Sequence, residues 1–148
     1  MTLGPDALVV VAQLHVAATL VMVGVIWTIQ RVHYPLFAYA DRARWDAFHA
    51  AHTRRITPVV APVMSVELAT AAALALAWPD GPWLVWPGLA LAVLTWGATG
   101  LIAVPVHARL AQAHDAALVR RLVATNWVRT AAWTVRAPLA LALAVAAG

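Results

Sequence analysis

The stretch at residues 7–31 reads ALVVVAQLHVAATLVMVGVIWTIQR, with no Asp, Glu, Lys or Arg before its last residue. About 20 apolar residues in a helix cross the hydrocarbon core of a bilayer. Similar stretches follow at residues 56–78, 84–107 and 123–147, the last being less hydrophobic at its start. The pattern predicts an all-α, polytopic membrane protein: a four-transmembrane-helix antiparallel bundle that forms a single domain over residues 1–148.

The composition agrees with a membrane protein. The 148 residues are 64% hydrophobic and 11% charged, with a mean hydropathy of +0.80, whereas a soluble domain is about a quarter charged.

The lack of Cys excludes disulfides, thiolate chemistry and Cys-based metal sites. The net charge is +4 and the pI about 11.1. We nevertheless reject a nucleic-acid partner, because orientation signals and anionic lipid headgroups account for arginines that flank apolar spans.

Arginine placement predicts the orientation in the membrane. The connections after the first and third spans carry most of the arginines, whereas the amino terminus and the turn at residues 79–82 carry none. Because Lys and Arg collect in cytoplasmic loops, we expect both connections to be cytoplasmic and both termini to lie outside. All basic residues are Arg and Ala is abundant, which is typical of GC-rich bacteria and predicts a bacterial inner membrane. No basic segment precedes the first span, so we expect no cleavable signal peptide.

The two arginine-rich connections are longer than the turn between the second and third spans. Residues 41–55 are polar and predict a short amphipathic helix on the surface. Residues 108–122 predict either an extension of the third span or a second surface helix. The sequence PDGP at residues 79–82 predicts a tight turn.

Two opposite charges lie deep in the predicted spans. Glu67 lies roughly 18 Å from the cytoplasmic end of the second span at ~1.5 Å per residue, and Arg136 lies at a similar depth in the fourth. A charge at the centre of a bilayer is costly, so such residues usually face a bundle interior and mark a functional site. We expect Glu67 and Arg136 to form an ion pair, which either only fixes helix packing or lines a substrate or cofactor cavity.

A polar stripe runs along the fourth span. Asn126, Arg129, Trp133 and Arg136 are spaced three, four and three residues apart, which places them on one helical face. A stripe with two arginines predicts an internal cavity that suits an anionic or electron-rich ligand, because Arg offers a planar fork of donors and stacks on rings. Asn126 and Trp133 are therefore candidate substrate-binding residues.

Histidines near the cytoplasmic ends of the spans are candidate metal ligands. His33 and His107 could combine with Glu67 in a His/carboxylate site for a transition metal. The alternative is that they are histidines hydrogen-bonded within the bundle. His107 could also reach the end of the stripe that carries Asn126 and Arg129.

Three further histidines have weaker signals. His49 and His52 are three residues apart and can present two nitrogens to one metal. On a surface segment, however, solvation is the simpler interpretation of such a pair. His15 lies well inside the first span, where it could serve as an axial haem ligand.

Two segments carry a resemblance to a known family. Residues 104–110 read VPVHARL, and residues 126–130 read NWVRT. This resembles the small four-helix membrane proteins related to anthrone oxygenases, which carry Val-Pro-Leu-Asn-x-Arg-Leu and then Asn-Trp-x-Arg-Thr. The likeness covers roughly the last third of the chain, and His107 stands where that family usually has Asn. It implies a four-helix fold and an oxygenase acting on polycyclic phenols.

A second, fainter resemblance is to the bacterial membrane protoporphyrinogen oxidase, also a four-helix protein with a His in its first helix. It rests on His15 and on the sequence RRITP at residues 54–58. It implies a haem-binding oxidase.

Two classes of function follow. The first is an oxygenase-type oxidoreductase on a hydrophobic aromatic substrate, in which Arg129 and Arg136 stabilise a phenolate or oxyanion and Glu67 or His107 removes the substrate proton. The second is a non-enzymatic binding or transport subunit, or a structural membrane component. The sequence GATG at residues 97–100 allows a close helix approach, either inside the bundle or in a homodimer.

Overall fold

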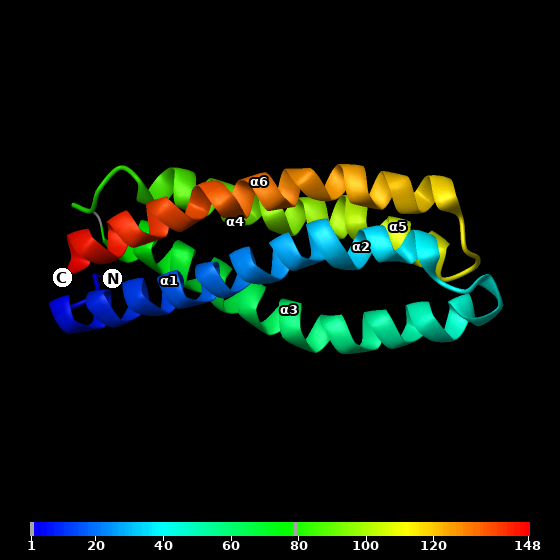
Figure 1. Cartoon of the computed structure of the whole chain (residues 1–148). Coiled ribbons are helices and arrows are strands. Elements are labelled where there is room, and N and C mark those ends of the chain that lie inside the picture. The colour runs from blue at the N-terminus through cyan, green and yellow to red at the C-terminus, as the bar shows by residue number, and fades with distance from the viewer. Residues whose placement is uncertain (1, 79) are drawn as a thin grey trace.

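Four long helical rods lie side by side and antiparallel in the computed structural model of the chain, with both termini at one end (Figure 1). The structure describes residues 2–78 and 80–148. The α1 rod packs against α3 and α6, and α4 packs against the same two helices. The first rod consists of α1 (Pro5–Thr28), η1 (Ile29–His33), α2 (Tyr34–Leu36) and η2 (Phe37–Tyr39), and the second of η3 (Arg42–Arg44) and α3 (Trp45–Ala77). The third consists of α4 (Val85–Ala98), η4 (Thr99–Ala103) and α5 (Val104–Leu110), and the fourth is α6 (Ala116–Ala147).

The rods are long and apolar enough to cross a membrane, with lengths of 35, 36, 26 and 32 residues. The predicted fold class is therefore confirmed: an all-α antiparallel bundle of four candidate membrane spans. At ~1.5 Å per residue a helix of this size reaches roughly 40–50 Å, more than the ~30 Å of a hydrocarbon core. The helices therefore extend beyond the apolar stretches that reveal them in the sequence.

The expected surface helix at residues 41–55 is wrong. The α3 helix begins at Trp45 and continues without interruption to Ala77. Its first turns are held to the bundle because the Trp45 indole Nε1 donates to the Leu110 carbonyl over 2.6 Å, and the Trp45 ring is buried. Residues 108–122 likewise form no separate surface helix, since α5 ends at Leu110 and α6 begins at Ala116.

Aspartates start the helices after the two short connections. The Asp41 carboxylate accepts from the Ala43 N–H at 2.9 Å, and Asp115 accepts from the Ala117 and Leu118 N–H groups at 2.7 and 3.1 Å. These bonds satisfy N–H groups that have no partner inside the helix. The same backbone donors lower the pKa of Asp115, because they stabilise its ionised form.

Two wide turns interrupt the first and third rods just before prolines. In η1 the Tyr34 N–H bonds to the Ile29 carbonyl, and in η4 the Val104 N–H bonds to the Thr99 carbonyl, both in the five-residue π pattern. Pro35 or Pro105 follows each turn, and proline has no N–H to continue the regular ladder. Such π turns often occur at functional sites.

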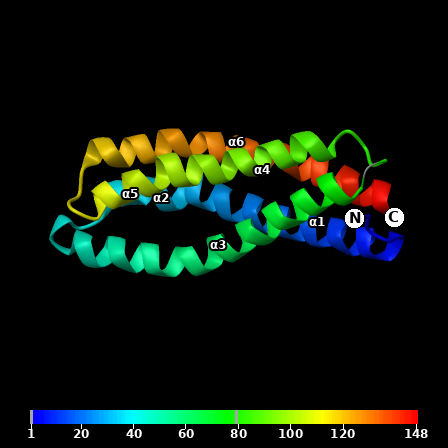
Figure 2. The same cartoon turned by 180° about the vertical axis from the view of Figure 1, so that it is seen from behind.

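The first half of α3 lies apart from the other helices, whereas its second half joins them (Figure 1, Figure 2). Pro58 and Pro62 lie inside α3 between these halves. Proline removes a helical hydrogen bond and bends a helix. The prolines therefore account for the bend that carries the first half of α3 away from the other helices.

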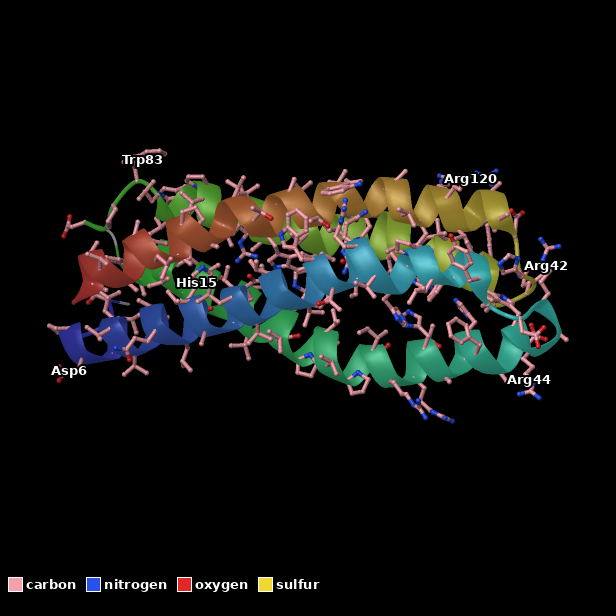
Figure 3. All side chains as sticks on the ribbon, in the orientation of Figure 1. Asp6, His15, Arg42, Arg44, Trp83 and Arg120 are labelled. Carbon is pink, nitrogen blue, oxygen red and sulfur yellow. The ribbon has the colours of Figure 1, made fainter. Side chains whose placement is uncertain are left out.

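The two ends of the bundle differ in charge. Arg42, Arg44 and Arg120 lie at the end opposite Asp6 and Trp83 (Figure 3). We call the end of the bundle that carries these three arginines the arginine-rich end. Trp83 and Trp86 are exposed at the other end, as expected for aromatic residues at a membrane interface.

The glycines at residues 97–100 do not serve packing inside the bundle. A Cβ atom at Gly97 or Gly100 would have no neighbouring atom within 4 Å. Ala98 between them is buried in the bundle, so the segment contributes to internal packing through Ala98, and the homodimer stays a prediction.

Candidate functional site

The polar stripe of α6 faces the interior, as predicted. Asn126, Arg129, Trp133 and Arg136 are exposed by only 3%, 4%, 0% and 1%. Their spacing keeps them on one side of a continuous helix, and that side packs against α1 and α4. The stripe divides into two parts with different partners.

The deeper part is a closed ion pair. The Arg136 Nη1 and Glu67 Oε1 atoms are 2.9 Å apart, with side-chain exposures of 1% and 2%. The Trp133 Nε1 donates to Glu67 Oε2 at 2.8 Å. The expected pairing is thus present and joins α3 to α6. Glu67 lines neither of the two large cavities described below, which places it away from the ligand on which it was expected to act as a base.

His15 belongs to the same buried layer. Its Nδ1 is 3.0 Å from the Thr70 Oγ1. The Thr70 hydroxyl also donates to a carbonyl of its own helix, so His15 Nδ1 is the donor to it. His15 lines neither of the two large cavities described below, and nothing around it supports the axial haem ligand expected from the sequence.

The shallower part of the stripe is a network centred on Arg129. The Arg129 Nη1 donates to the Asn126 Oδ1 at 3.1 Å, and the Asn126 Nδ2 donates to the Gln30 Oε1 at 2.8 Å. Gln30 in turn donates to the Val123 carbonyl at 3.1 Å. The Arg129 guanidinium lies 5.4 Å from the centre of the Trp133 ring. Asn126 and Trp133 therefore hold Arg129 in place.

Arg129 also lies at one end of a chain of polar side chains that includes one residue from each rod. Its guanidinium lies near the Tyr34 hydroxyl, and both residues line the cavity described below. The Tyr34 Oη is 3.0 Å from the His107 Nε2, and the His107 Nδ1 is 3.1 Å from the His49 Nε2. Tyr34 follows the wide turn η1 directly, and His107 lies in α5, the helix that follows η4. Tyr34 is not among the residues predicted for the site, although the Tyr-Pro step at residues 34–35 marks the turn.

A second histidine pair lies against this chain. The His33 Nε2 is 2.7 Å from the His52 Nδ1, and the His52 ring stacks on His107 with centroids 5.3 Å apart. The His52 Nε2 is buried and has no hydrogen-bond partner. His49 and His52 are 2% and 8% exposed, so the expectation of a solvated pair is wrong. The signal was the spacing of Trp45, His49 and His52, four and three residues apart, which gives this segment one inward face.

The metal site expected from His33, His107 and Glu67 is not formed. Glu67 lies 15 residues after His52 on the same helix, or about 22 Å along it. Across residues 2–78 and 80–148, no three His, Cys, Asp or Glu side chains are placed to hold a metal ion. The stacked rings of His52 and His107 explain this for the histidines, because stacked rings direct their nitrogens sideways to separate partners.

The chain from Arg129 to His49 forms the polar end of a cavity on the α4–α5 side of α3. Its volume is about 580 Å³, within the usual ~300–1,000 Å³ of small-molecule sites. The exposed carboxylate of Asp46 also lines it. The polar residues of the lining are Tyr34, Asp46, His49, His52, Thr53, Thr57, Thr99, His107 and Arg129, and the apolar wall includes Ile56, Val60, Met64, Trp96 and Val104.

This lining changes the predicted site. His107 and Arg129 line the cavity as expected, whereas Glu67, Trp133 and Arg136 do not. Asn126 contacts the cavity only through Arg129. Glu67, Trp133 and Arg136 instead bind one another in the deeper part of the stripe.

A second cavity of about 700 Å³ lies on the α1 side of α3. Its walls are apolar apart from Thr28, His33, His52 and Arg55. Ile29, His52 and Ile56 line both cavities and form the wall between them.

No family model, curated protein or solved structure matches this chain. The likeness to proteins related to anthrone oxygenases therefore stays an expectation from residues 104–110 and 126–130. The structure provides the site geometry on which a function can be proposed.

Proposed function

We propose that this membrane protein binds a hydrophobic aromatic molecule with an acidic hydroxyl group and acts on it as an oxygenase-type oxidoreductase. The observation that carries the proposal is the apolar cavity of about 580 Å³ with Tyr34, His107 and Arg129 at one end. An apolar wall suits a ring system that arrives from lipid, and a few converging polar groups orient its hydroxyl.

The three polar residues have complementary roles in this proposal. Arg129 is a buried guanidinium with no carboxylate partner among the hydrogen bonds of its network, so it favours an anionic oxygen in the cavity. His107, through the Tyr34 hydroxyl, accepts the proton that the ligand loses. Glu67 and Arg136 maintain the bundle and do not contact the ligand.

The oxidation step is the part that rests on the resemblance. Loss of a proton makes the aromatic ligand electron-rich, and dioxygen is the proposed oxidant. A ring methylene would lose two hydrogens and gain one oxygen atom as a carbonyl, while the second oxygen atom leaves as water. Binding without any consumption of dioxygen would instead identify a binding subunit.

Arg129→Gln is expected to weaken binding of β-naphthol by about ten- to a hundredfold, because hydrogen bonds to a charged group contribute about 1.5–3 kcal/mol. The neutral and anionic forms of β-naphthol absorb at different wavelengths. With the wild-type protein in detergent micelles, the bound form should be the anion at a pH where free β-naphthol is neutral. With Arg129→Gln, any bound β-naphthol should be neutral.

The matched control is Arg121→Gln, which removes an exposed arginine from the same helix. It should bind as the wild type does. A folded Arg129→Gln protein that binds the anion with unchanged affinity would contradict the role of Arg129.

We also propose that the arginine-rich end faces the cytoplasm of a bacterial cell and that both termini lie outside. The chain has no Cys, so an introduced cysteine is its only thiol. A membrane-impermeant maleimide added to intact spheroplasts should label Asp6→Cys and should label Ala43→Cys only after permeabilisation. The reverse pattern would show the opposite orientation.

A further inference from the structure

The hydrogen bonds around His107 can all run in one direction. The positive Arg129 guanidinium lies near the Tyr34 hydroxyl, so it favours an O–H proton that points away from it and is donated to the His107 Nε2. In a neutral imidazole only one nitrogen carries a proton, so the proton of His107 is on Nδ1. It then donates to the His49 Nε2, and the proton of His49 is on its own Nδ1.

We propose that Tyr34, His107 and His49 form a proton relay that carries the proton of the bound ligand to the mouth of the cavity at the arginine-rich end. This inference rests on the proposed function, because it begins with a hydroxyl-bearing ligand. It adds His49, which the ligand need not contact, as the residue through which the proton leaves.

Each transfer in the relay breaks one bond to hydrogen and forms another. The ligand hydroxyl gives its proton to the Tyr34 oxygen, and Tyr34 gives its own proton to the His107 Nε2. His107 releases its Nδ1 proton to the His49 Nε2, and His49 releases its Nδ1 proton. The net result is an anionic ligand beside Arg129 and one proton outside the site. The reverse sequence resets the relay when the ligand leaves.

The position of His49 suits a proton exit. Asp46 lies one turn earlier on α3, is exposed and lines the same cavity. Its carboxylate, or water beside it, can receive the proton from His49. His49 ends the hydrogen-bonded chain that begins at Tyr34 and passes through His107.

The neighbouring histidine pair offers no such exit. His33 and His52 share one hydrogen bond of 2.7 Å, and the other nitrogen of His52 is buried without a partner. Among the described residues, no hydrogen bond joins this pair to Tyr34, His107 or His49, so it takes no proton from the relay. The control for His49 is His114, a histidine in the connection before α6 that lines neither large cavity.

His49→Gln tests the relay. A glutamine oxygen can still accept from the His107 Nδ1, but it cannot take up a proton and pass it on. After rapid mixing with β-naphthol in weakly buffered micelles, a pH indicator should report proton release. We expect His49→Gln to slow this release by about tenfold with equilibrium affinity within about twofold, and added imidazole to restore part of the rate. His114→Gln should release protons at the wild-type rate.

The outcomes separate the relay from the ligand site. Unslowed release from His49→Gln would overturn the relay and leave the ligand site intact. Failure of the wild type to bind β-naphthol would overturn the proposed function and the relay with it.

A second measurement needs neither a ligand nor a variant. Nitrogen NMR of histidine-labelled wild-type protein should show His107 protonated on Nδ1. Protonation on Nε2 would contradict the direction of the chain.

Discussion

Glu67→Leu is expected to lower the free energy of unfolding by about 3–5 kcal/mol, because it leaves the Arg136 guanidinium buried without a counter-charge. The two groups are 2.9 Å apart and almost fully buried. The same substitution removes the acceptor of the Trp133 indole N–H. Unfolding by SDS in mixed micelles, followed by circular dichroism, measures the change.

Two control variants test whether the isolated charge of Arg136 causes the loss of stability. The double variant Glu67→Leu/Arg136→Met removes both charges, and it should recover most of the lost stability because no isolated charge remains. Asp6→Asn changes an exposed carboxylate on α1 and should alter the free energy of unfolding by less than about 0.5 kcal/mol. A cost below about 1 kcal/mol for Glu67→Leu would show that the pair does not lie in a dry interior.

The four spans and the α6 stripe could be predicted because their signals lie within single segments of the chain. Length and hydropathy reveal a span, and the three-four-three spacing from Asn126 to Arg136 defines a helical face. The contact between Glu67 and Arg136 followed from equal depth in two helices together with the cost of an isolated charge in hydrocarbon.

The histidine cluster could not be assembled in the same way. His49 and His52 lie in a polar segment, and polarity alone suggested a surface helix. Their inward direction depends on α3 continuing through that segment and on Trp45 bonding to the Leu110 carbonyl of another rod. The roles of Tyr34 and His107 depend on partners from three other segments, which spacing within one segment does not reveal.

The assignment of Glu67 to the cavity failed for a related reason. Sequence predicts how deep a residue lies in the bundle, but not which side chains close around it. Glu67 contacts Arg136 and Trp133, whereas the cavity lies nearer the arginine-rich end, where Arg129 has no salt-bridge partner among the described residues.

The bend in α3 places one cavity on each of its sides, and only one of them has Tyr34, His107 and Arg129 at its end. Ala61 and Ala51 are partly buried residues of this helix. Ala61 lines the cavity with the polar end, and Ala51 lines the other. A phenylalanine at either position therefore fills the cavity that this position lines and leaves the other cavity open.

The most direct measurement is the affinity for β-naphthol of Ala61→Phe compared with Ala51→Phe, by titration in micelles. Overpacking a filled site costs up to about 3 kcal/mol, so Ala61→Phe should weaken binding by roughly a hundredfold. Ala51→Phe should leave the affinity within about twofold of the wild type. Unchanged binding by a folded Ala61→Phe protein, or an equal loss in both variants, would contradict a ligand site between α3 and α4–α5.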